Sequence, residues 1–206
     1  MVMRDLWLAS GNKKKRAELE RLLTPLGVRL HTPEELGSPF APAEDAPDFA
    51  GNARIKAEAL AQMCGGIALG DDSGLCVDAL GGRPGVHSAR YGGPGLDDRG
   101  RLERLLDELA SVRPAARTAH FVCSLCVAAA GGRVLAAIEE SCAGTLLTAA
   151  RGTAGFGYDP IFVPIEFGGD PTRTFAQLDP ATKDRLSHRG KALRRLAAEL
   201  PHLLAP

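Results

Sequence analysis

Two adjacent carboxylates, Asp71 and Asp72, close an apolar segment and are followed at once by Ser73 and Gly74. The pattern of residues 67–69 predicts the end of a buried strand, after which we expect the chain to turn at a sheet edge. Neighbouring carboxylates repel each other and are costly to desolvate unless a cation or a proton lies between them. The pair therefore predicts a divalent metal site or an acid/base pair. A turn with both side chains in water is the alternative that these residues leave open.

The length and charge of the chain limit its class. With 206 residues it is long enough to bury a large core in one domain, or in one domain with two lobes. Its 25 lysines and arginines balance 25 acidic residues, which argues against a nucleic-acid partner. The first ten residues include Asp5 and contain no apolar stretch of signal-peptide length, and the apolar runs elsewhere are short. We therefore expect a cytoplasmic protein that binds no membrane.

The cysteines predict reduced thiols rather than a disulfide framework, because their number is odd and most lie in apolar segments. They are Cys64, Cys76, Cys123, Cys126 and Cys142. Cys123 and Cys126 form a C-x-x-C pair, but in a strand they would point to opposite faces. No second pair completes a zinc site.

Helical and strand patterns alternate early in the chain, and a hairpin follows later. Strands are expected over residues 4–9, 28–31, a segment ending at 71, 118–130 and 133–143. Helices are expected over residues 13–23, 49–63, 97–109 and from 179–180 to about 200. Gly131 and Gly132 are typical of a two-residue hairpin turn, and the segments 33–48 and 81–95 are expected to be irregular. This order predicts a mixed α/β sheet.

A run of lysines begins the first expected helix. The turn and the helix start consist of Ser10, Gly11, Asn12, Lys13, Lys14 and Lys15. Cations at a helix N-terminus oppose the helix dipole by up to about 1 kcal/mol each, so a compensating anion is expected. Backbone N–H groups, a hydroxyl and ammonium groups together suit phosphate. The segment lacks the spaced glycines of a Walker A loop, and a solvated lysine run remains the alternative.

An acidic loop precedes the second expected helix. It contains Glu44 and Asp45, and the helix then places Asn52 and Lys56 one turn apart on one face. A carboxylate from this loop, together with the pair at 71–72, would suit Mg²⁺, which prefers one or two carboxylates plus phosphate oxygens and water. An acidic loop that is merely solvated is the alternative.

Phe156 lies between two glycines in the segment 155–160, which leaves its ring face open for stacking on a planar base. The alternative is a turn whose aromatic side chains are anchored in the core.

In the final helix, Lys183, Ser187 and Gly190 share a face, whereas Lys183 and Arg189 are poorly aligned. These groups cannot all point one way in a regular helix. A basic surface helix would explain the lysine and the arginines, but Gly190 in mid-helix indicates close approach by another group.

Six blocks read in chain order point to a known family. They are SGNKKK (10–15), FAGNARIK (49–56), DDSGL (71–75), PGVHSARY (84–91), GFGYDP (155–160) and SHRG (187–190). In that order the chain resembles the inosine triphosphate pyrophosphatase family, also called XTP/dITP diphosphatases, which remove deaminated purine nucleotides from the precursor pool. The blocks extend over nearly the whole chain.

The resemblance implies a fold and a reaction. The fold is α/β, with a long mixed central sheet flanked by helices and two lobes with an active-site cleft between them, in a single domain over residues 1–206. The reaction is the Mg²⁺-dependent hydrolysis of ITP, dITP or XTP to the monophosphate and pyrophosphate, commonly by a homodimer. Donors near His188 and Arg189 would select the 6-keto group of the purine over the 6-amino group of adenine.

The resemblance also assigns residues. Asp72 is the catalytic proton acceptor and a metal ligand, Glu44 matches an acidic metal ligand, and Asp71 is a further candidate ligand. Ser10 to Lys15 line the triphosphate, and Ser73 contacts the substrate. The other expected substrate-binding residues are Asn52, Lys56, Phe156, Gly157, Tyr158, Asp159, Lys183, His188 and Arg189. The chain departs from the family pattern at Ser10 for threonine, at Ala43-Glu44 for a Glu-Glu pair and at Ala154 for glycine.

Two other functions are considered. A nucleotide sensor without turnover would use the lysines and Phe156, but the Asp71-Asp72 pair argues against it. A nucleic-acid-binding module would use the basic segment 183–195, but the zero net charge and the few aromatic residues disfavour it.

Overall fold

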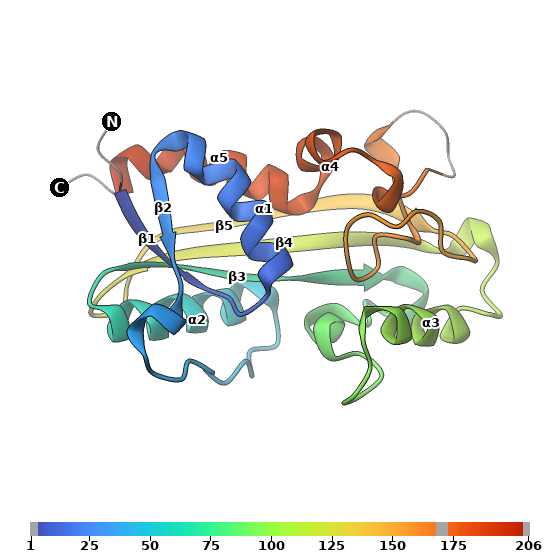
Figure 1. Ribbon diagram of the computed structural model, residues 1–206. Coiled ribbons are helices and arrows are strands. Elements are labelled where there is room, and N and C mark those ends of the chain that lie inside the picture. Colours follow the sequence, from blue (N-terminus) through green and yellow to red (C-terminus); the bar gives the residue numbers. More distant parts are fainter. Residues whose placement is uncertain (1–3, 168–172, 204–206) are drawn as a thin grey trace. The chain divides into compact units, whose positions relative to one another are not determined.

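The computed structural model describes residues 4–167 and 173–203 (Figure 1). The strands are β1 (Arg4–Ala9), β2 (Val28–His31), β3 (Ile67–Val77), β4 (Thr118–Ala129), β5 (Arg133–Leu146) and β6 (Phe162–Pro164). The helices are α1 (Lys13–Leu23), α2 (Phe49–Cys64), α3 (Asp98–Glu108), α4 (Pro180–Leu186) and α5 (His188–Leu203). Short 3₁₀ turns occupy parts of the segments expected to be irregular, such as Gly85–Arg90. In the described ranges, none of the helices combines the length and the apolar character that a membrane crossing requires.

The strands form one mixed sheet in the order β2-β1-β3-β4-β5-β6. Strand β1 runs parallel to both β2 and β3, whereas β5 and β6 are antiparallel. Gly131 and Gly132 join β4 to β5 with φ values of 86° and 80°, which a tight hairpin turn requires and glycine adopts without strain. The predicted mixed sheet flanked by helices is therefore confirmed.

The chain divides into two compact units. The first contains the chain up to Asp72, Cys123–Glu140 and the chain from Arg189 onward, and the second contains Ser73–Val122 and Ser141–His188. Strands β3, β4 and β5 each contribute residues to both units. The single two-lobed domain with a cleft stays a prediction.

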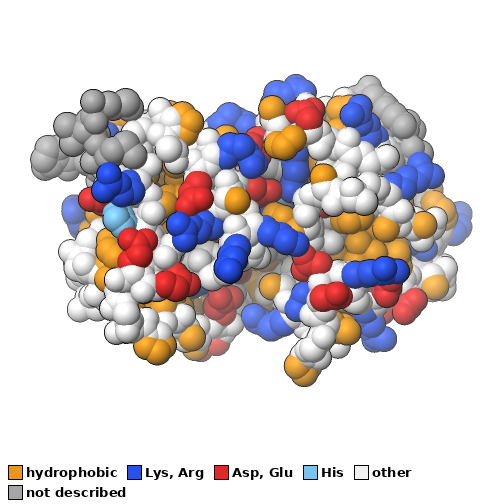
Figure 2. All heavy atoms as spheres, viewed as in Figure 1, with side chains coloured by type: hydrophobic (Ala, Val, Ile, Leu, Met, Phe, Trp, Pro, Cys, Tyr) orange, Lys and Arg blue, Asp and Glu red, His pale blue; other side chains and the backbone are white. Residues whose placement is uncertain are grey.

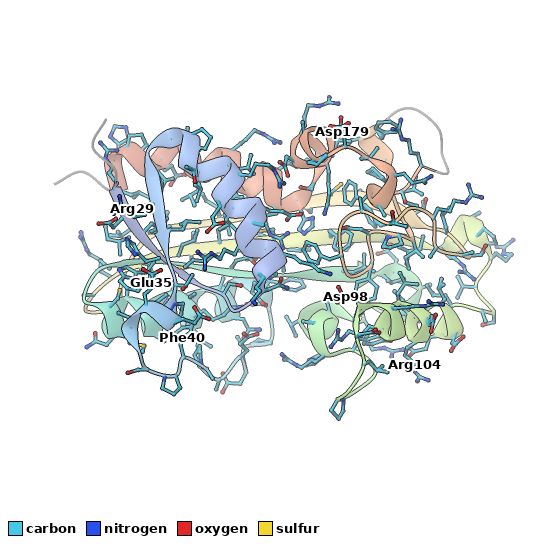
Figure 3. All side chains as sticks on the ribbon, in the orientation of Figure 1. Arg29, Glu35, Phe40, Asp98, Arg104 and Asp179 are labelled. Carbon is cyan, nitrogen blue, oxygen red and sulfur yellow. The ribbon has the colours of Figure 1, made fainter. Side chains whose placement is uncertain are left out.

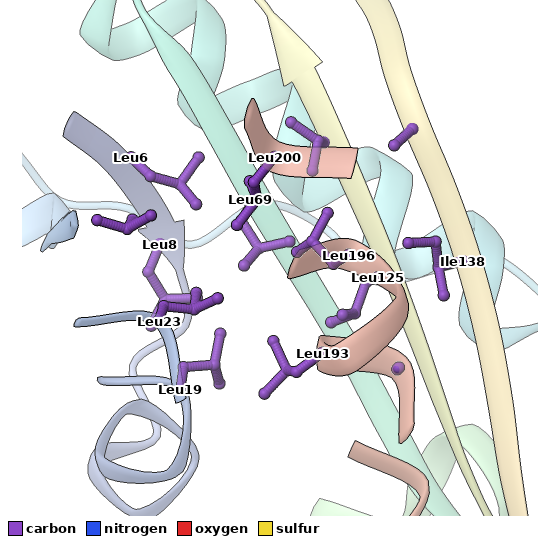
Figure 4. Packing of buried hydrophobic residues seen from close by; sticks show 14 of the residues in the cluster. Leu6, Leu8, Leu19, Leu23, Leu69, Leu125, Ile138, Leu193, Leu196 and Leu200 are labelled. Atoms are coloured by element: carbon purple, nitrogen blue, oxygen red, sulfur yellow. The ribbon is translucent and has the colours of Figure 1, made fainter. Parts of the chain in front are cut away.

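The first unit has a core on each face of its part of the sheet. Helices α1 and α5 cover one face with leucines such as Leu19 and Leu196, which pack against Leu69 of β3 (Figure 4). Helix α2 covers the other face through small residues, among them Ala53 and Ala57. Cys123 belongs to the first core and Cys126 to the second, so the two thiols point to opposite faces as predicted.

The second unit is built around aromatic rings and the apolar faces of α3 and α4. The ring centroids of Phe121 and Phe162 lie 4.6 Å apart, and those of Phe162 and Phe175 lie 5.0 Å apart. The imidazole of His188 stacks on Phe121 with a centroid distance of 4.7 Å and an interplanar angle of 9°. This packing places the residue before Arg189 in an aromatic core.

Two expectations about local structure are wrong. The chain does not turn after Asp72, because β3 continues to Val77 and lies between β1 and β4 rather than at a sheet edge. The final helix is not continuous, since Ser187 has extended backbone angles of −68° and 152° and separates α4 from α5. Both differences arise from distant side chains that neutralise or pack against these segments, as the site shows.

Gly70 allows α2 to approach β3. A Cβ atom at this position would lie 2.0 Å from the carbonyl oxygen of Ala53 and 2.9 Å from the nitrogen of Ala57. We therefore expect Gly70→Ala to lower the free energy of unfolding by at least about 2 kcal/mol, measured by urea denaturation. Gly66→Ala is the control, because its Cβ would meet its nearest neighbours at an ordinary 3.6 Å. Equal stability of the two variants would contradict this role of Gly70.

Candidate functional site

The start of α1 is organised by Asn12. Its side-chain oxygen accepts hydrogen bonds from the backbone nitrogens of Lys14 and Lys15 at 3.0 and 3.2 Å. The hydroxyl of Ser10 accepts from the backbone nitrogen of Asn12 at 3.3 Å. Lys13 and Lys14 are exposed, whereas Lys15 is half-buried. The predicted helix start is therefore present, with two lysines at the surface and a third directed inward.

Lys15 reaches the carboxylate of Asp71, whose side chain is 0% exposed. The Nε of Arg189 contacts the second oxygen of Asp71 at 3.1 Å, and the Nη1 of Arg189 pairs with Glu18. The thiol of Cys123 lies 3.7 Å from the same Asp71 oxygen. Residues from α1, β3, β4 and α5 thus surround one buried negative charge.

The charges around Asp71 decide its protonation. Burial raises the pKa of this carboxyl, but the positive charges of Lys15 and Arg189 outweigh burial and hold the pKa well below its usual range. Burial lowers the pKa of Arg189, but Asp71 and Glu18 outweigh burial and raise it. Asp71 and Arg189 are therefore both ionised and form a buried pair of opposite charges.

Asp72 points to the other face of β3, because successive side chains of a strand alternate. Its carboxylate contacts the Nζ of Lys56 at 2.8 Å and the amide nitrogen of Asn52 at 3.4 Å, both from α2. The same Nζ lies 3.4 Å from Glu44. Asn52 also accepts a hydrogen bond from the backbone nitrogen of Ala46 at 3.1 Å, which ties the acidic loop to the helix.

The surroundings of Asp72 have the opposite electrostatic effect from those of Asp71. Burial raises the pKa of Asp72, and the attraction to Lys56 does not fully offset it. Two neighbouring carboxyl groups of one strand are thus driven apart in pKa, an arrangement that separates an ion-pairing role from an acid/base role.

Asp72 and Glu44 are the candidate ligands for a metal ion. No group of three or more His, Cys, Asp or Glu side chains is arranged to hold one in residues 4–167 and 173–203. Asp72 and Glu44, however, converge on the single ammonium of Lys56, so the two carboxylates already face one centre of positive charge. Two carboxylates completed by phosphate oxygens and water fit Mg²⁺. Asp71 as a ligand stays a prediction, and its contacts favour a counterion role.

A second cluster lies within the second unit. The carboxylate of Asp159 accepts hydrogen bonds from the backbone nitrogen of Phe156 at 2.8 Å and from Lys183 at 2.7 Å. The ammonium of Lys183 lies 5.0 Å from the ring centroid of Phe156, which is half-buried and outside the core. Tyr158 is a core residue whose hydroxyl donates to the backbone oxygen of Ser88 at 3.1 Å. Tyr158 therefore anchors the segment in the core, and Phe156 lies beside Lys183.

The predicted site residues thus form two groups, one in each unit. The first group is Ser10, Gly11, Asn12, Lys13, Lys14, Lys15, Glu44, Asn52, Lys56, Asp71, Asp72 and Arg189. The second group is Ser73, Phe156, Gly157, Tyr158, Asp159, Lys183 and His188. The peptide bonds 72–73 and 188–189 join the two groups in the chain. Sequence reasoning missed Glu18, because its partner Arg189 lies 171 positions away in the chain.

The surface charge is mixed. On the face shown in Figure 2, lysine and arginine side chains are interspersed with acidic ones, so neither sign of charge forms a continuous patch there. On the face shown, this distribution agrees with the zero net charge of the sequence.

Comparisons with known proteins cover nearly the whole chain. A model described as the Ham1 family matches residues 6–199. A dITP/XTP pyrophosphatase from Gloeobacter violaceus is 48% identical over 197 residues, which cover 95% of this chain and 93% of the relative. One from Geobacillus kaustophilus is 44% identical over 196 residues, covering 94% of this chain and 93% of the relative.

Solved structures give the same result. A HAM1 protein from Coxiella burnetii has a TM-score of 0.86 and 36% identity, covering 97% of this chain and 100% of that chain. A structure described as a nucleoside-triphosphatase / dITP/XTP pyrophosphatase from Mycobacterium abscessus has a TM-score of 0.74 and 40% identity, covering 97% and 99%. The fold of this chain is therefore that of known Ham1 structures.

Replacement by asparagine should have opposite effects on the free energy of unfolding at Asp71 and at Asp72. Asp71→Asn leaves Lys15 and Arg189 without their shared charge, so we expect a loss of about 3–5 kcal/mol in the free energy of unfolding at pH 7. Asp72→Asn removes a charge that burial disfavours, so stability should be unchanged or higher. Both are measured by urea denaturation with a chelator present.

The pH dependence of this effect has a definite sign. The pKa of Asp71 is lowered in the folded state, so its contribution is complete above the unfolded-state value of about 3.8 and declines as the pH falls below it. The difference between wild type and Asp71→Asn should therefore narrow in acid. Equal losses for the two variants at pH 7 would contradict their different environments.

Proposed function

The chain belongs to the Ham1 family, and we propose that it hydrolyses the deaminated purine nucleoside triphosphates ITP, dITP and XTP to the monophosphate and pyrophosphate. The relatives named dITP/XTP pyrophosphatase support this reaction class. The observation that carries the proposal is the pair Asp71 and Asp72. One carboxylate holds Lys15 and Arg189, and the other faces Lys56 together with Glu44.

The triphosphate is assigned to the start of α1. Lys13 and Lys14 are exposed there. Asn12 caps the backbone nitrogens of Lys14 and Lys15, so the ammonium groups and the positive end of the helix dipole are what act on the anion. The carboxylate of Asp71 pairs with Lys15, so the Lys15 ammonium is already held in place before the substrate binds. Such preorganisation stabilises negative charge that develops on the leaving pyrophosphate.

Asp72 is assigned the role of proton acceptor. It positions a water molecule for attack on the α-phosphorus and takes its proton, while the bond from the α-phosphorus to the bridging oxygen breaks and pyrophosphate leaves. Lys56 and Asn52 fix the carboxylate for this role. Mg²⁺ held by Asp72 and Glu44 would neutralise phosphate charge.

The purine is assigned to the cluster of the second unit. Phe156 offers a ring for stacking, and Lys183 and His188 supply nitrogen groups at the 6-position. A 6-keto oxygen accepts hydrogen bonds, whereas the amino group of adenine would leave buried donors unpaired. Arg189 is held through Nε and Nη1 by Asp71 and Glu18, which restricts how its guanidinium can meet a base. The family resemblance further supports a cytoplasmic homodimer with Mg²⁺ as cofactor.

A product assay tests the proposal. With Mg²⁺, we expect pyrophosphate and the monophosphate from ITP, dITP and XTP, and slower turnover of ATP. Asp72→Asn should lower kcat at least about 10²-fold in a folded protein, because it removes a base while keeping the shape. Asp45→Asn, at an exposed position of the acidic loop, is the control and should keep wild-type kcat. Orthophosphate as the primary product, equal turnover of ATP, or nucleotide binding without turnover would overturn the proposal.

Phe156 provides the test of base stacking. Because stacking acts through the π-face and not through the 6-substituent, Phe156→Ala should weaken binding of ITP and ATP alike by about 1–3 kcal/mol. Phe156→Tyr retains the ring and should bind normally. Binding is measured as KM and as the affinity for the monophosphate. If Phe156→Ala unfolds the protein or leaves KM for ITP unchanged, the ring is a structural anchor instead.

A further inference from the structure

We propose that Asp98 is a positioning residue that holds the purine-stacking segment in its binding conformation. The inference rests on the proposed function, because it assigns Phe156 to the base. Asp98 is the first residue of α3 (Figure 3) and belongs to none of the six sequence blocks. Its Oδ2 accepts a hydrogen bond from the backbone nitrogen of Gly157 at 3.2 Å, within the second unit.

The backbone on both sides of Phe156 needs such restraint. Gly155 and Gly157 have φ values of 75° and 58°, in the left-handed region that glycine enters freely. Glycine also loses the most conformational freedom on ordering, so a glycine on each side makes the ring position costly to fix. The orientation of the ring therefore depends on the contacts of the neighbouring peptide groups.

Two carboxylates supply these contacts. The backbone nitrogen of Phe156 donates to Asp159 at 2.8 Å, and that of Gly157 donates to Asp98. Consecutive N–H groups are thus bound by two carboxylates, one from the same turn and one from α3. Charged acceptors make stronger hydrogen bonds than neutral ones. Asp159 also pairs with Lys183, so it links the segment to α4, whereas Asp98 links it to α3.

Asp98 is not required to cap its own helix. The N-cap of α3 is Asp97, whose side chain accepts from the backbone nitrogen of Gly100 at 2.8 Å. Asp98 also forms an ion pair with Arg101 one turn later at 3.5 Å, with an exposed carboxylate and a half-buried guanidinium. A purely structural role would include this ion pair and a favourable helix-dipole effect. The contact with Gly157 gives Asp98 a second role, which is to hold the segment that is proposed to stack on the purine base.

The positioning role makes a kinetic prediction. Asp98→Ala should raise KM for ITP and ATP together by about 3- to 10-fold, the equivalent of one lost hydrogen bond. It should change kcat less than about twofold, because the phosphate-binding residues lie in the first unit. Inhibition by inorganic tripolyphosphate, which has no base, should not change. If the role of Asp98 were only structural, Asp98→Ala would lower thermal stability, and the binding of nucleotides and the binding of tripolyphosphate would not respond differently.

The matched variants are Asp98→Asn and Asp107→Asn. The amide of Asp98→Asn keeps an oxygen for the N–H of Gly157, so its KM should stay within about threefold of wild type. Asp107 is an exposed acid on the same helix, and its replacement controls for charge alone. In a double-mutant cycle, adding Asp98→Ala to Phe156→Ala should cause no further loss of purine affinity, because Asp98 acts through Phe156.

The outcomes separate this inference from the proposed function. If wild type releases pyrophosphate from ITP but folded Asp98→Ala keeps wild-type KM, or if the two losses add in full, the positioning role is overturned while the function stands. If wild type neither turns over ITP nor binds the monophosphate in calorimetry, both are overturned. Should Asp98→Ala fail to fold, amide exchange of Gly157 in wild type decides: protection supports the bond, and exchange at the rate of an open amide refutes it.

Discussion

The buried carboxylate of Asp71 imposes the main constraint on the first unit. A charge that is fully removed from water is several kcal/mol unfavourable unless cations surround it, and here α1 and α5 each supply one, through Lys15 and Arg189. Arg189 is the second of these two cations, and Glu18 balances its positive charge. Because these residues lie up to 171 positions apart in the chain, the network requires α1, β3 and α5 to be assembled together. The leucine core beneath it adds stability to the same arrangement (Figure 4).

The alternation of a β-strand turns this constraint into a division of roles. Asp71 and Asp72 are neighbours, yet one faces α1 and α5 while the other faces α2. Their environments differ accordingly. Burial has the larger effect on the pKa of Asp72, because the positive charge of Lys56 is shared with Glu44. If β3 carried only one of the two carboxylates, it would provide either the rigid ion pair or the candidate proton acceptor, but not both. Having both on one strand places the proposed base, Asp72, directly after the carboxylate that holds Lys15, the lysine proposed to bind phosphate.

Local signals in the sequence were sufficient for most elements. The bounds of α1 follow from a cap at Asn12 and the leucine period, and the hairpin follows from Gly131-Gly132. The continuation of β3 through Asp71 was not predictable in this way, since the cations that permit it come from residues 15 and 189. The break at Ser187 depends on His188 packing against Phe121. Glu18 and Asp98 escaped notice because their partners lie 171 and 59 positions away in the sequence.

A carboxyl titration of the two aspartates by ¹³C NMR, in the metal-free protein, tests the central claim most directly. The Asp71 signal should stay that of an ionised carboxylate over the whole pH range in which the protein is folded, because the pKa of Asp71 is strongly lowered. The Asp72 signal should titrate with a pKa above the ordinary value of 3.8. Two signals that titrate together near that value, or in the reverse order, would contradict the separation of roles between the neighbouring carboxylates.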